Sequence, residues 1–129
     1  NNDVTQQSNW KDTIKIVIPA RGDKEYKLLL TKGQKFEYFW ESNGEKLFFD
    51  YHGEPTGGKA GYFESFKKGT EKQASGYLIP SFNGTHGWYW KNKKPFSVTI
   101  TLKVNGTYKR IDIKDIPISK ESITHDTID

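Results

Sequence analysis

The chain of 129 residues contains no cysteine, no methionine and no long apolar run. Without cysteine it has no disulfide bond, thiol nucleophile or thiolate metal ligand. Without methionine, residue 1 is not a native start, and we expect a processed chain that has lost a signal peptide or an N-terminal membrane anchor. No stretch approaches the roughly 20 apolar residues that span a bilayer. The sequence therefore predicts a small domain that is stabilised by packing alone.

Aromatic residues make up 15% of the chain, and glycine occurs 12 times. Apolar residues alternate with polar ones in 13–18 and 97–104, which is the period of a strand with one buried face. Asn-Gly pairs at 43–44 and 105–106 predict two-residue β-hairpins. Short strands separated by turn residues, with no long helical period, predict an all-β protein. We expect an antiparallel β-sandwich, jelly-roll-like, with about eight strands.

One segment holds two of the four tryptophans. Trp88 and Trp90 alternate with Tyr89 and Lys91, so each pair shares one face of an expected strand. A sandwich core needs large inward residues at alternate positions. We therefore expect Trp88 and Trp90 to be buried, together with Trp40. The aliphatic residues expected beside them are Val98, Ile100 and Leu102.

Changes in composition predict the domain boundaries. Residues 1–12 are polar and aperiodic, and predict a flexible linker from a removed anchor or signal. The sandwich is expected to span 13–113, and 114–129 to form a partly ordered tail. Within the sandwich, residues 53–73 predict a long loop, which in a compact domain is usually functional or mobile.

The net charge of +4 arises from 20 basic and 16 acidic residues, mixed along the chain. Such a pattern is typical of a solvated surface. A nucleic-acid groove needs basic side chains on one face among stacking aromatics. The only candidate is the segment 91–94, with three lysines beside the tryptophan pair, and acidic residues elsewhere dilute its field. We expect no nucleic-acid partner.

The residues that catalysis would need are present without a recognisable arrangement. Ser65 and Ser97 lack any nucleophile context, and no glycine-rich phosphate loop opens a helix. Asp50, Glu54 and Glu64 could supply paired carboxylates for glycoside hydrolysis, but so small a domain offers little cleft. The sequence therefore predicts a protein that is not an enzyme.

Three residues could hold a metal ion. His52, Glu54 and His86 offer imidazole and carboxylate ligands that suit Zn²⁺ or Cu²⁺. If the two strand ends meet at one rim of the sandwich, they would form a weak, open site completed by water. The alternative is that both imidazoles are structural and hydrogen-bond loop carbonyl groups. No other cofactor is expected.

Four further aromatic residues are candidates for binding: Tyr51, Tyr62, Phe63 and Tyr89. If the tryptophans fill the core, these rings face outward. Exposed rings of this kind stack on sugars or anchor protein partners as hot spots.

The order of these features resembles a GOLD domain, the β-sandwich module of vesicle cargo receptors with bacterial relatives. The resemblance runs from Ile14 to Val104. It includes a strand that ends in Pro19, an aromatic strand after Gly33, and a final aromatic strand followed by Asn92. The His-Gly-Glu-Pro and Gly-Thr-His-Gly-Trp-Tyr-Trp segments resemble small bacterial envelope proteins with an N-terminal membrane anchor. The resemblance implies a periplasm-facing accessory or binding domain, anchored to the inner membrane in the full-length protein.

Two functions remain open at this point. The first is a non-enzymatic envelope domain that holds a protein partner through its aromatic face and the 53–73 loop. The second is a small-ligand module, which binds a metal ion through His52 and His86 or a sugar through exposed rings. The sequence leaves the partner and the oligomeric state undefined.

Overall fold

The computed structural model describes residues 9–58 and 62–111, which contain nine strands and no helix. The strands are β1 (Asp12–Ile18), β2 (Asp23–Leu30), β3 (Phe36–Glu41), β4 (Leu47–Pro55), β5 (Glu64–Glu71), β6 (Gln73–Leu78), β7 (Gly84–Lys91), β8 (Val98–Gly106) and β9 (Lys109–Arg110). Within these two ranges, no helix is long and apolar enough to cross a membrane.

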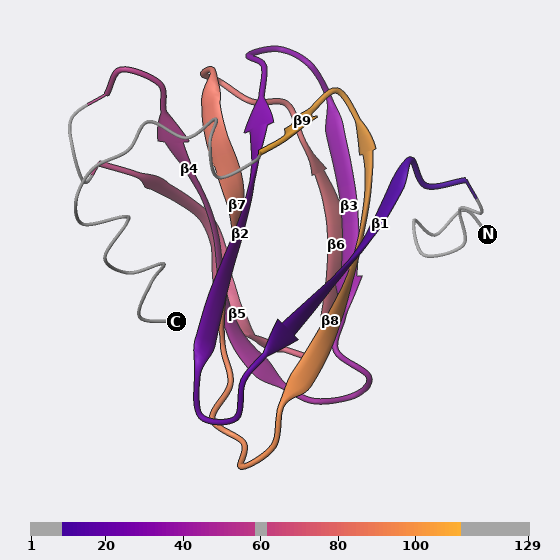
Figure 1. Ribbon diagram of the computed structural model, residues 1–129. Helices are drawn as coiled ribbons and strands as arrows, with labels where there is room; N and C mark the ends of the chain where they lie inside the picture. The colour runs from indigo at the N-terminus through magenta and orange to yellow at the C-terminus, as the bar shows by residue number, and fades with distance from the viewer. Residues whose placement is uncertain (1–8, 59–61, 112–129) are drawn as a thin grey trace.

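The strands form two antiparallel sheets that face each other (Figure 1). One sheet has four strands in the order β1-β8-β3-β6, and the other has five in the order β5-β4-β7-β2-β9. Successive strands alternate between the sheets, except that β4 and β5 form a hairpin within the five-stranded sheet. Without β9, this is the eight-stranded connectivity of a jelly roll. The predicted all-β antiparallel sandwich is confirmed, with nine strands instead of about eight.

Both predicted Asn-Gly hairpins are wrong. Asn43 and Gly44 do form a tight turn, with φ of 57° and 88°, but it leads from β3 in one sheet to β4 in the other. Gly106 is the last residue of β8 and lies opposite Phe36, while β9 pairs with β2. An Asn-Gly pair sets local backbone torsions, whereas the partner of a strand is selected by burial of its whole face.

The core between the sheets is aromatic. Trp40, Trp88 and Trp90 are at most 1% exposed, as predicted. The Tyr51 ring lies nearly parallel to Trp88, with centroids 4.8 Å apart and an interplanar angle of 8°. Trp88 is in turn parallel to Trp90 at 6.0 Å. The aliphatic residues predicted for the core are also buried: Val98, Ile100 and Leu102.

The segment 53–73, predicted as a loop, is mostly strand. β4 continues to Pro55, and β5 begins at Glu64. The polar composition of β5 led to this error, because an edge strand carries charged side chains that protect its free backbone groups. Most of the predicted linker 1–12 and the whole predicted tail 114–129 lie outside the described residues. The sandwich itself begins with β1 at Asp12.

Gly87 occupies the middle of the five-stranded sheet. It lies between His52 of β4 and Lys27 of β2 in the strand register. A Cβ atom built on Gly87 would approach the Tyr26 carbonyl oxygen to 1.9 Å. Only glycine therefore allows β7 to pair with β2 at this position. The sheet consequently has no side chain between His52 and Lys27.

Candidate binding face

Most of the candidate residues lie on the outer face of the five-stranded sheet. The burial pattern of β4 places Phe49 and Tyr51 inward, so the residues between them point away from the core. Strands β7 and β2 alternate in the same way. Together the three strands build the middle of this face from Asp23, Glu25, Lys27, Asp50, His52, Glu54, Thr85 and Tyr89.

A polar network links β4 to β2 across the gap at Gly87. The Nε2 atom of His52 lies 3.4 Å from a Glu25 carboxylate oxygen. Lys27 Nζ contacts Glu54 at 2.7 Å and Glu25 at 3.7 Å. The Thr85 hydroxyl donates a hydrogen bond to Glu54 at 3.3 Å. Because Gly87 has no side chain, these long side chains meet over the backbone of β7.

The network shifts the pKa values of its members. The hydrogen bond that His52 donates to the Glu25 carboxylate, aided by the Asp50 carbonyl oxygen, raises the pKa of His52 above its ordinary value against the effect of burial. The same hydrogen bond lowers the pKa of Glu25, again against burial. Burial and the Asp23 carboxylate raise the pKa of Tyr89 to about 12, so its hydroxyl remains a donor to Asp23 at 2.9 Å. This face is therefore held together by charge-assisted hydrogen bonds.

His86 belongs to the opposite, inner face of the same sheet. It pairs in register with Gly53, and its ring lies between Phe82 and Phe66, with centroids 4.8 and 5.8 Å away. Its Nδ1 is 3.0 Å from the Gly84 carbonyl oxygen. Burial lowers the pKa of this imidazole, so it is neutral at pH 7. His86 is a packed structural residue.

His52, Glu54 and His86 do not converge on a common point in the structure. His52 and His86 lie one position apart in the register but on opposite faces of the sheet. Glu54, the proposed third ligand, is paired with Lys27. In the ranges 9–58 and 62–111, no group of three His, Cys, Asp or Glu side chains is placed to hold a metal ion. The metal prediction is corrected accordingly: alternation within a strand separates the two imidazoles.

The four predicted binding rings have different surroundings. Tyr51 is only 3% exposed and packs on Trp88, so the expectation that it faces outward is wrong. Tyr89 is half-buried, and its hydroxyl is bonded to Asp23. Tyr62 and Phe63 are each 48% exposed, beside each other in the β4–β5 connection. Phe63 also contacts His52, with centroids 5.2 Å apart. Of the four predicted binding rings, the structure therefore exposes the adjacent pair Tyr62 and Phe63.

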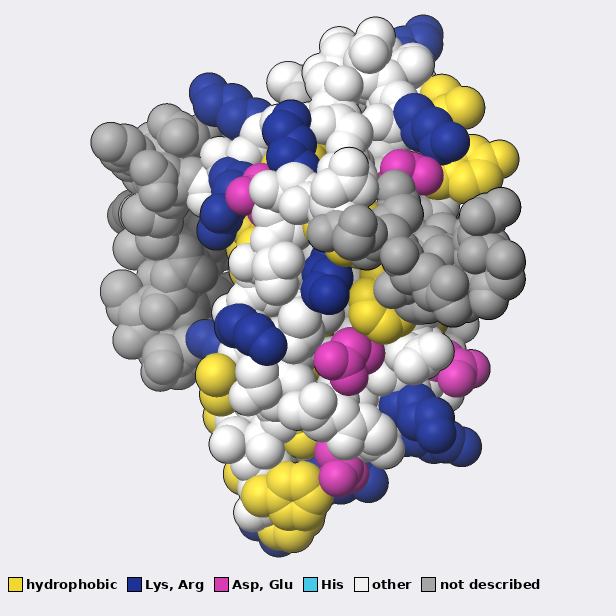
Figure 2. Space-filling view, turned by 90° about the vertical axis from the view of Figure 1, so that its right-hand side faces the viewer, with side chains coloured by type: hydrophobic (Ala, Val, Ile, Leu, Met, Phe, Trp, Pro, Cys, Tyr) yellow, Lys and Arg dark blue, Asp and Glu magenta, His cyan; other side chains and the backbone are white. Residues whose placement is uncertain are grey.

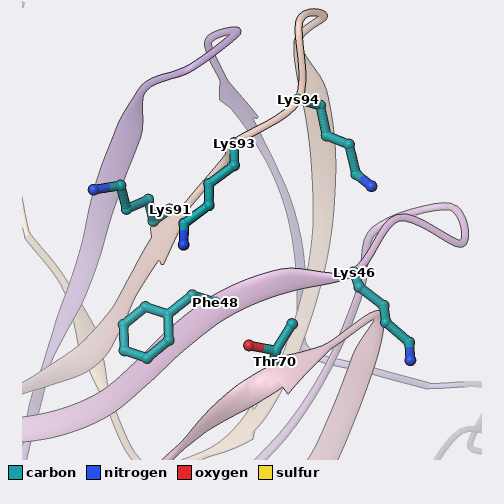
Figure 3. A pocket seen from close by; sticks show the side chains of 6 residues that line it. All are labelled: Lys46, Phe48, Thr70, Lys91, Lys93 and Lys94. Carbon is teal, nitrogen blue, oxygen red and sulfur yellow. The ribbon is translucent and has the colours of Figure 1, made fainter.

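The sequence did not reveal a second feature, a shallow hollow of about 330 Å³ (Figure 3). We call it the lysine hollow. Its lining residues come from three separate segments of the chain and are Lys46, Phe48, Thr70, Lys91, Lys93 and Lys94. The run at 91–94 was the only sequence signal. Lys46, Phe48 and Thr70 join it because β4 lies between β5 and β7, an order that the sequence does not reveal.

Asn92 holds the loop that carries these lysines. Its side chain is fully buried, and its Nδ2 donates to the carbonyl oxygens of Pro19 at 3.0 Å and Phe96 at 2.8 Å. The backbone N–H of Lys94 donates to its Oδ1 at 2.9 Å. A buried amide with its polar groups satisfied fixes the loop geometry. The neighbouring lysines are consequently presented from a rigid base.

The outer face of the four-stranded sheet differs from that of the five-stranded sheet (Figure 2). Basic, acidic and hydrophobic side chains form small separate groups over it. Its exposed ring, Tyr77, is covered on one side by Lys35 Nζ, 4.8 Å from the ring centroid. Lys15 is bonded to the Thr101 hydroxyl at 2.8 Å. No described cluster on this face matches the lysine hollow.

Comparison with known proteins adds no family. No family model matches the chain, and no curated protein matches it. Among solved structures, the Yersinia pseudotuberculosis-derived mitogen is similar, with 14% sequence identity and a TM-score of 0.49. The match covers 84% of this chain and 94% of that protein. At this level of similarity it carries no functional inference.

Proposed function

We propose that this protein is a non-catalytic binding domain that holds a protein partner at the β4–β5 end of the five-stranded sheet. One observation carries the proposal. Tyr62 and Phe63 are adjacent and each 48% exposed, and they lie next to the polar network of the outer face. Large aromatic residues surrounded by polar groups are the usual anchors of protein interfaces.

The contacts of these two rings suit an anchor. Phe63 rests on the His52 ring, so part of its surface is already ordered before a partner arrives. The Tyr62 hydroxyl donates to Glu64 at 3.1 Å. The exposed aromatic surface is thereby presented with little rotamer freedom left to lose. The remaining polar groups of the face would form the rim of the interface.

The carboxylates of this face support a non-catalytic role. Glu54 is paired with Lys27, and Glu25 with His52. Asp50 accepts a hydrogen bond from Ser65 at 2.9 Å. General acid–base work needs a carboxyl group that is free to exchange a proton with a substrate. These three groups are instead engaged in holding the sheet together.

The GOLD-like order of features and the likeness to anchored envelope proteins supply the setting of the proposal. In that setting, the full-length protein is anchored in the bacterial inner membrane and presents this domain to the periplasm. Its partner is another envelope protein. The support for this part is the sequence resemblance alone.

A double substitution tests the proposal. Full-length protein with Tyr62→Ser/Phe63→Ser would be compared with wild type by native gel electrophoresis of detergent-extracted envelopes. We expect the wild type in a complex larger than its own size and the variant outside it. The control is Tyr77→Ser/Ile79→Ser, which removes two side chains that are 64% and 56% exposed on the other sheet.

The proposal requires that the control variant stay in the complex. If the control leaves the complex and the Tyr62→Ser/Phe63→Ser variant remains, the four-stranded side is the interface and the proposal is wrong. The thermal melting of each purified variant shows whether it is folded, so that loss of the complex is not mistaken for loss of the domain.

A further inference from the structure

The lysine hollow contains more positive charge than its neighbours neutralise. Of the four lysines that line it, only Lys94 has a carboxylate of the described residues within 4 Å, that of Glu45 at 3.6 Å. Lys46, Lys91 and Lys93 have no carboxylate partner among the described residues. Positive charges that no carboxylate neutralises raise the local electrostatic potential and attract anions. The hollow is therefore an electrostatic site for a ligand with negative charge.

The floor of the hollow is an aromatic ring. Phe48 is half-buried, and its ring meets Tyr89 edge-on, with centroids 6.3 Å apart. In Figure 3 the Thr70 side chain lies beside this ring, and Lys93 extends from its loop toward it. A hydroxyl and an ammonium group thus flank an apolar surface. Such a floor suits a compact body with C–H groups on its face and polar groups around its rim.

The shape of the surroundings limits the ligand. The volume of about 330 Å³ lies at the lower end of small-molecule sites, which run from about 300 to 1,000 Å³. Asp23 pairs in register with Lys91, and Asp50 with Tyr89, so acidic residues border the hollow on the same face. An extended polyanion that ran along the sheet would meet this acidic border. The site fits a small unit or the end of a chain.

We propose that the lysine hollow binds a small saccharide of one or two sugar rings that carries sulfate or carboxylate groups. A sugar ring lies on Phe48, and its anionic groups reach the ammonium groups of Lys91 and Lys93. The Thr70 hydroxyl exchanges hydrogen bonds with ring hydroxyl groups. The Asn92-organised loop keeps the lysines in place before the ligand binds. This site is separate from the Tyr62 and Phe63 anchor.

A nucleic acid fits the same features less well. Sequence-tolerant binding of single strands uses several aromatic platforms along a basic groove. The hollow offers a single platform, Phe48, and the acidic border interrupts the path of a phosphate chain. These features therefore favour a small saccharide over a nucleic acid.

Isothermal titration calorimetry tests the proposal, with a fully sulfated uronic-acid disaccharide as the probe. The variant Lys91→Gln/Lys93→Gln is expected to bind at least about tenfold more weakly than wild type, since it loses two charge-assisted contacts. The control Lys32→Gln/Lys109→Gln removes the same charge at the opposite end of the sandwich and should change binding less than about twofold. Phe48→Ser should weaken the wild-type affinity by a similar tenfold or more.

Further titrations separate the possible ligands. The same disaccharide without sulfate groups and sodium sulfate alone are both expected to bind more weakly than the complete probe. The proposal is overturned if the control pair loses as much affinity as the Lys91 and Lys93 pair, if sodium sulfate binds as well as the disaccharide, or if only single-stranded DNA or phosphatidylglycerol vesicles bind. Should the lysine variant fail to fold, raising the ionic strength from about 0.05 M to about 0.5 M must still weaken wild-type binding.

Discussion

The two faces of the five-stranded sheet come from the same strands but treat similar side chains in opposite ways. On the inner face, His86 is packed between two phenylalanine rings, and burial lowers its pKa. On the outer face, His52 lies one register position away, and Glu25 raises its pKa. Tyr51 and Tyr89 differ in the same manner: one is stacked in the core, and the other is bonded to Asp23.

This difference shows how the work of the sheet is divided. The inner face derives its stability from apolar area and close packing, so its residues tolerate little change. The outer face is held by hydrogen bonds between partly exposed groups, which contribute less each. In the described part of this sheet, the side chains that a partner can reach belong to the outer face, among them Phe63 and the lysines. We therefore expect substitutions on the inner face to change stability and those on the outer face to change binding.

The largest effect should come from the inner face. Trp88→Ala removes a ring that is 1% exposed and parallel to both Tyr51 and Trp90. We expect the free energy of unfolding to fall by about 3–5 kcal/mol. Tyr89→Phe, one residue along on the outer face, removes only the hydrogen bond to Asp23 and should cost about 0.5–1.5 kcal/mol. Urea denaturation of both variants measures the contrast, and equal losses would contradict it.

A second, somewhat smaller loss of stability is expected at Gly87, in the middle of the five-stranded sheet. Gly87→Ala would force a Cβ to within 1.9 Å of the Tyr26 carbonyl oxygen, so β7 and β2 must separate. We expect a loss of about 3 kcal/mol, at the upper end of overpacking. In Gly69→Ala the new Cβ meets only the Phe49 ring, at 3.5 Å, and stability should change little. The melting temperatures of the two variants decide whether the close approach of the β2 backbone is the reason that position 87 requires glycine.

A smaller effect is expected from the outer-face pair. Because the pKa of folded His52 is raised, its contribution is complete below about pH 6.5, the value for free histidine, and is lost as pH rises through the folded pKa. The lowered pKa of Glu25 adds stability that is present above its ordinary value of 4.5 and is lost as pH falls through the folded pKa. His52→Gln should therefore cost most between about pH 4.5 and 6.5.

The size of that cost is limited by solvent. The Glu25 side chain is 46% exposed, so we expect about 0.2–1 kcal/mol for the pair. Comparing wild type and His52→Gln by urea denaturation across pH 4–9 measures it. His86 acts in the opposite direction but equally in both proteins, so its contribution cancels. A difference that grows above pH 7 would contradict the assignment.

A pH titration of the unsubstituted protein compares the two faces with the smallest perturbation. Nitrogen-15 NMR titration of the two imidazoles should give His52 a pKa above the ordinary value and His86 a pKa below it. The separation follows from a carboxylate partner on one face and an apolar sandwich on the other. Two identical titration curves would mean that the two faces provide the same environment.

The sequence predicted the core better than the connections. Strict alternation identified Trp88 and Trp90 as inward residues, because a period of two is a local property of the chain. The Asn-Gly turn at 43–44 was also recognised, but not that it leads to the other sheet. Strand order depends on which strand faces bury each other, and these strands can be far apart in the sequence. Turn residues do not determine it.

The candidate site was predictable to a smaller extent. Tyr62 and Phe63 are exposed, as expected from the argument that the tryptophans fill the core. Tyr51 was placed outward because the paired aromatics of β4 gave no clear phase. The lysine hollow was not predictable, because Lys46 and Thr70 are far from residues 91–94 along the chain. Only the order β5-β4-β7 brings them together.

The most direct test of the proposed binding face is photo-crosslinking in cells that make the full-length protein. A photoreactive phenylalanine analogue would replace Phe63 on the five-stranded side or Tyr77 on the four-stranded side, in separate strains. The account predicts one discrete crosslinked protein from position 63 and none from position 77. A discrete adduct from position 77 with none from position 63 would contradict it, because the binding face would then be the other sheet.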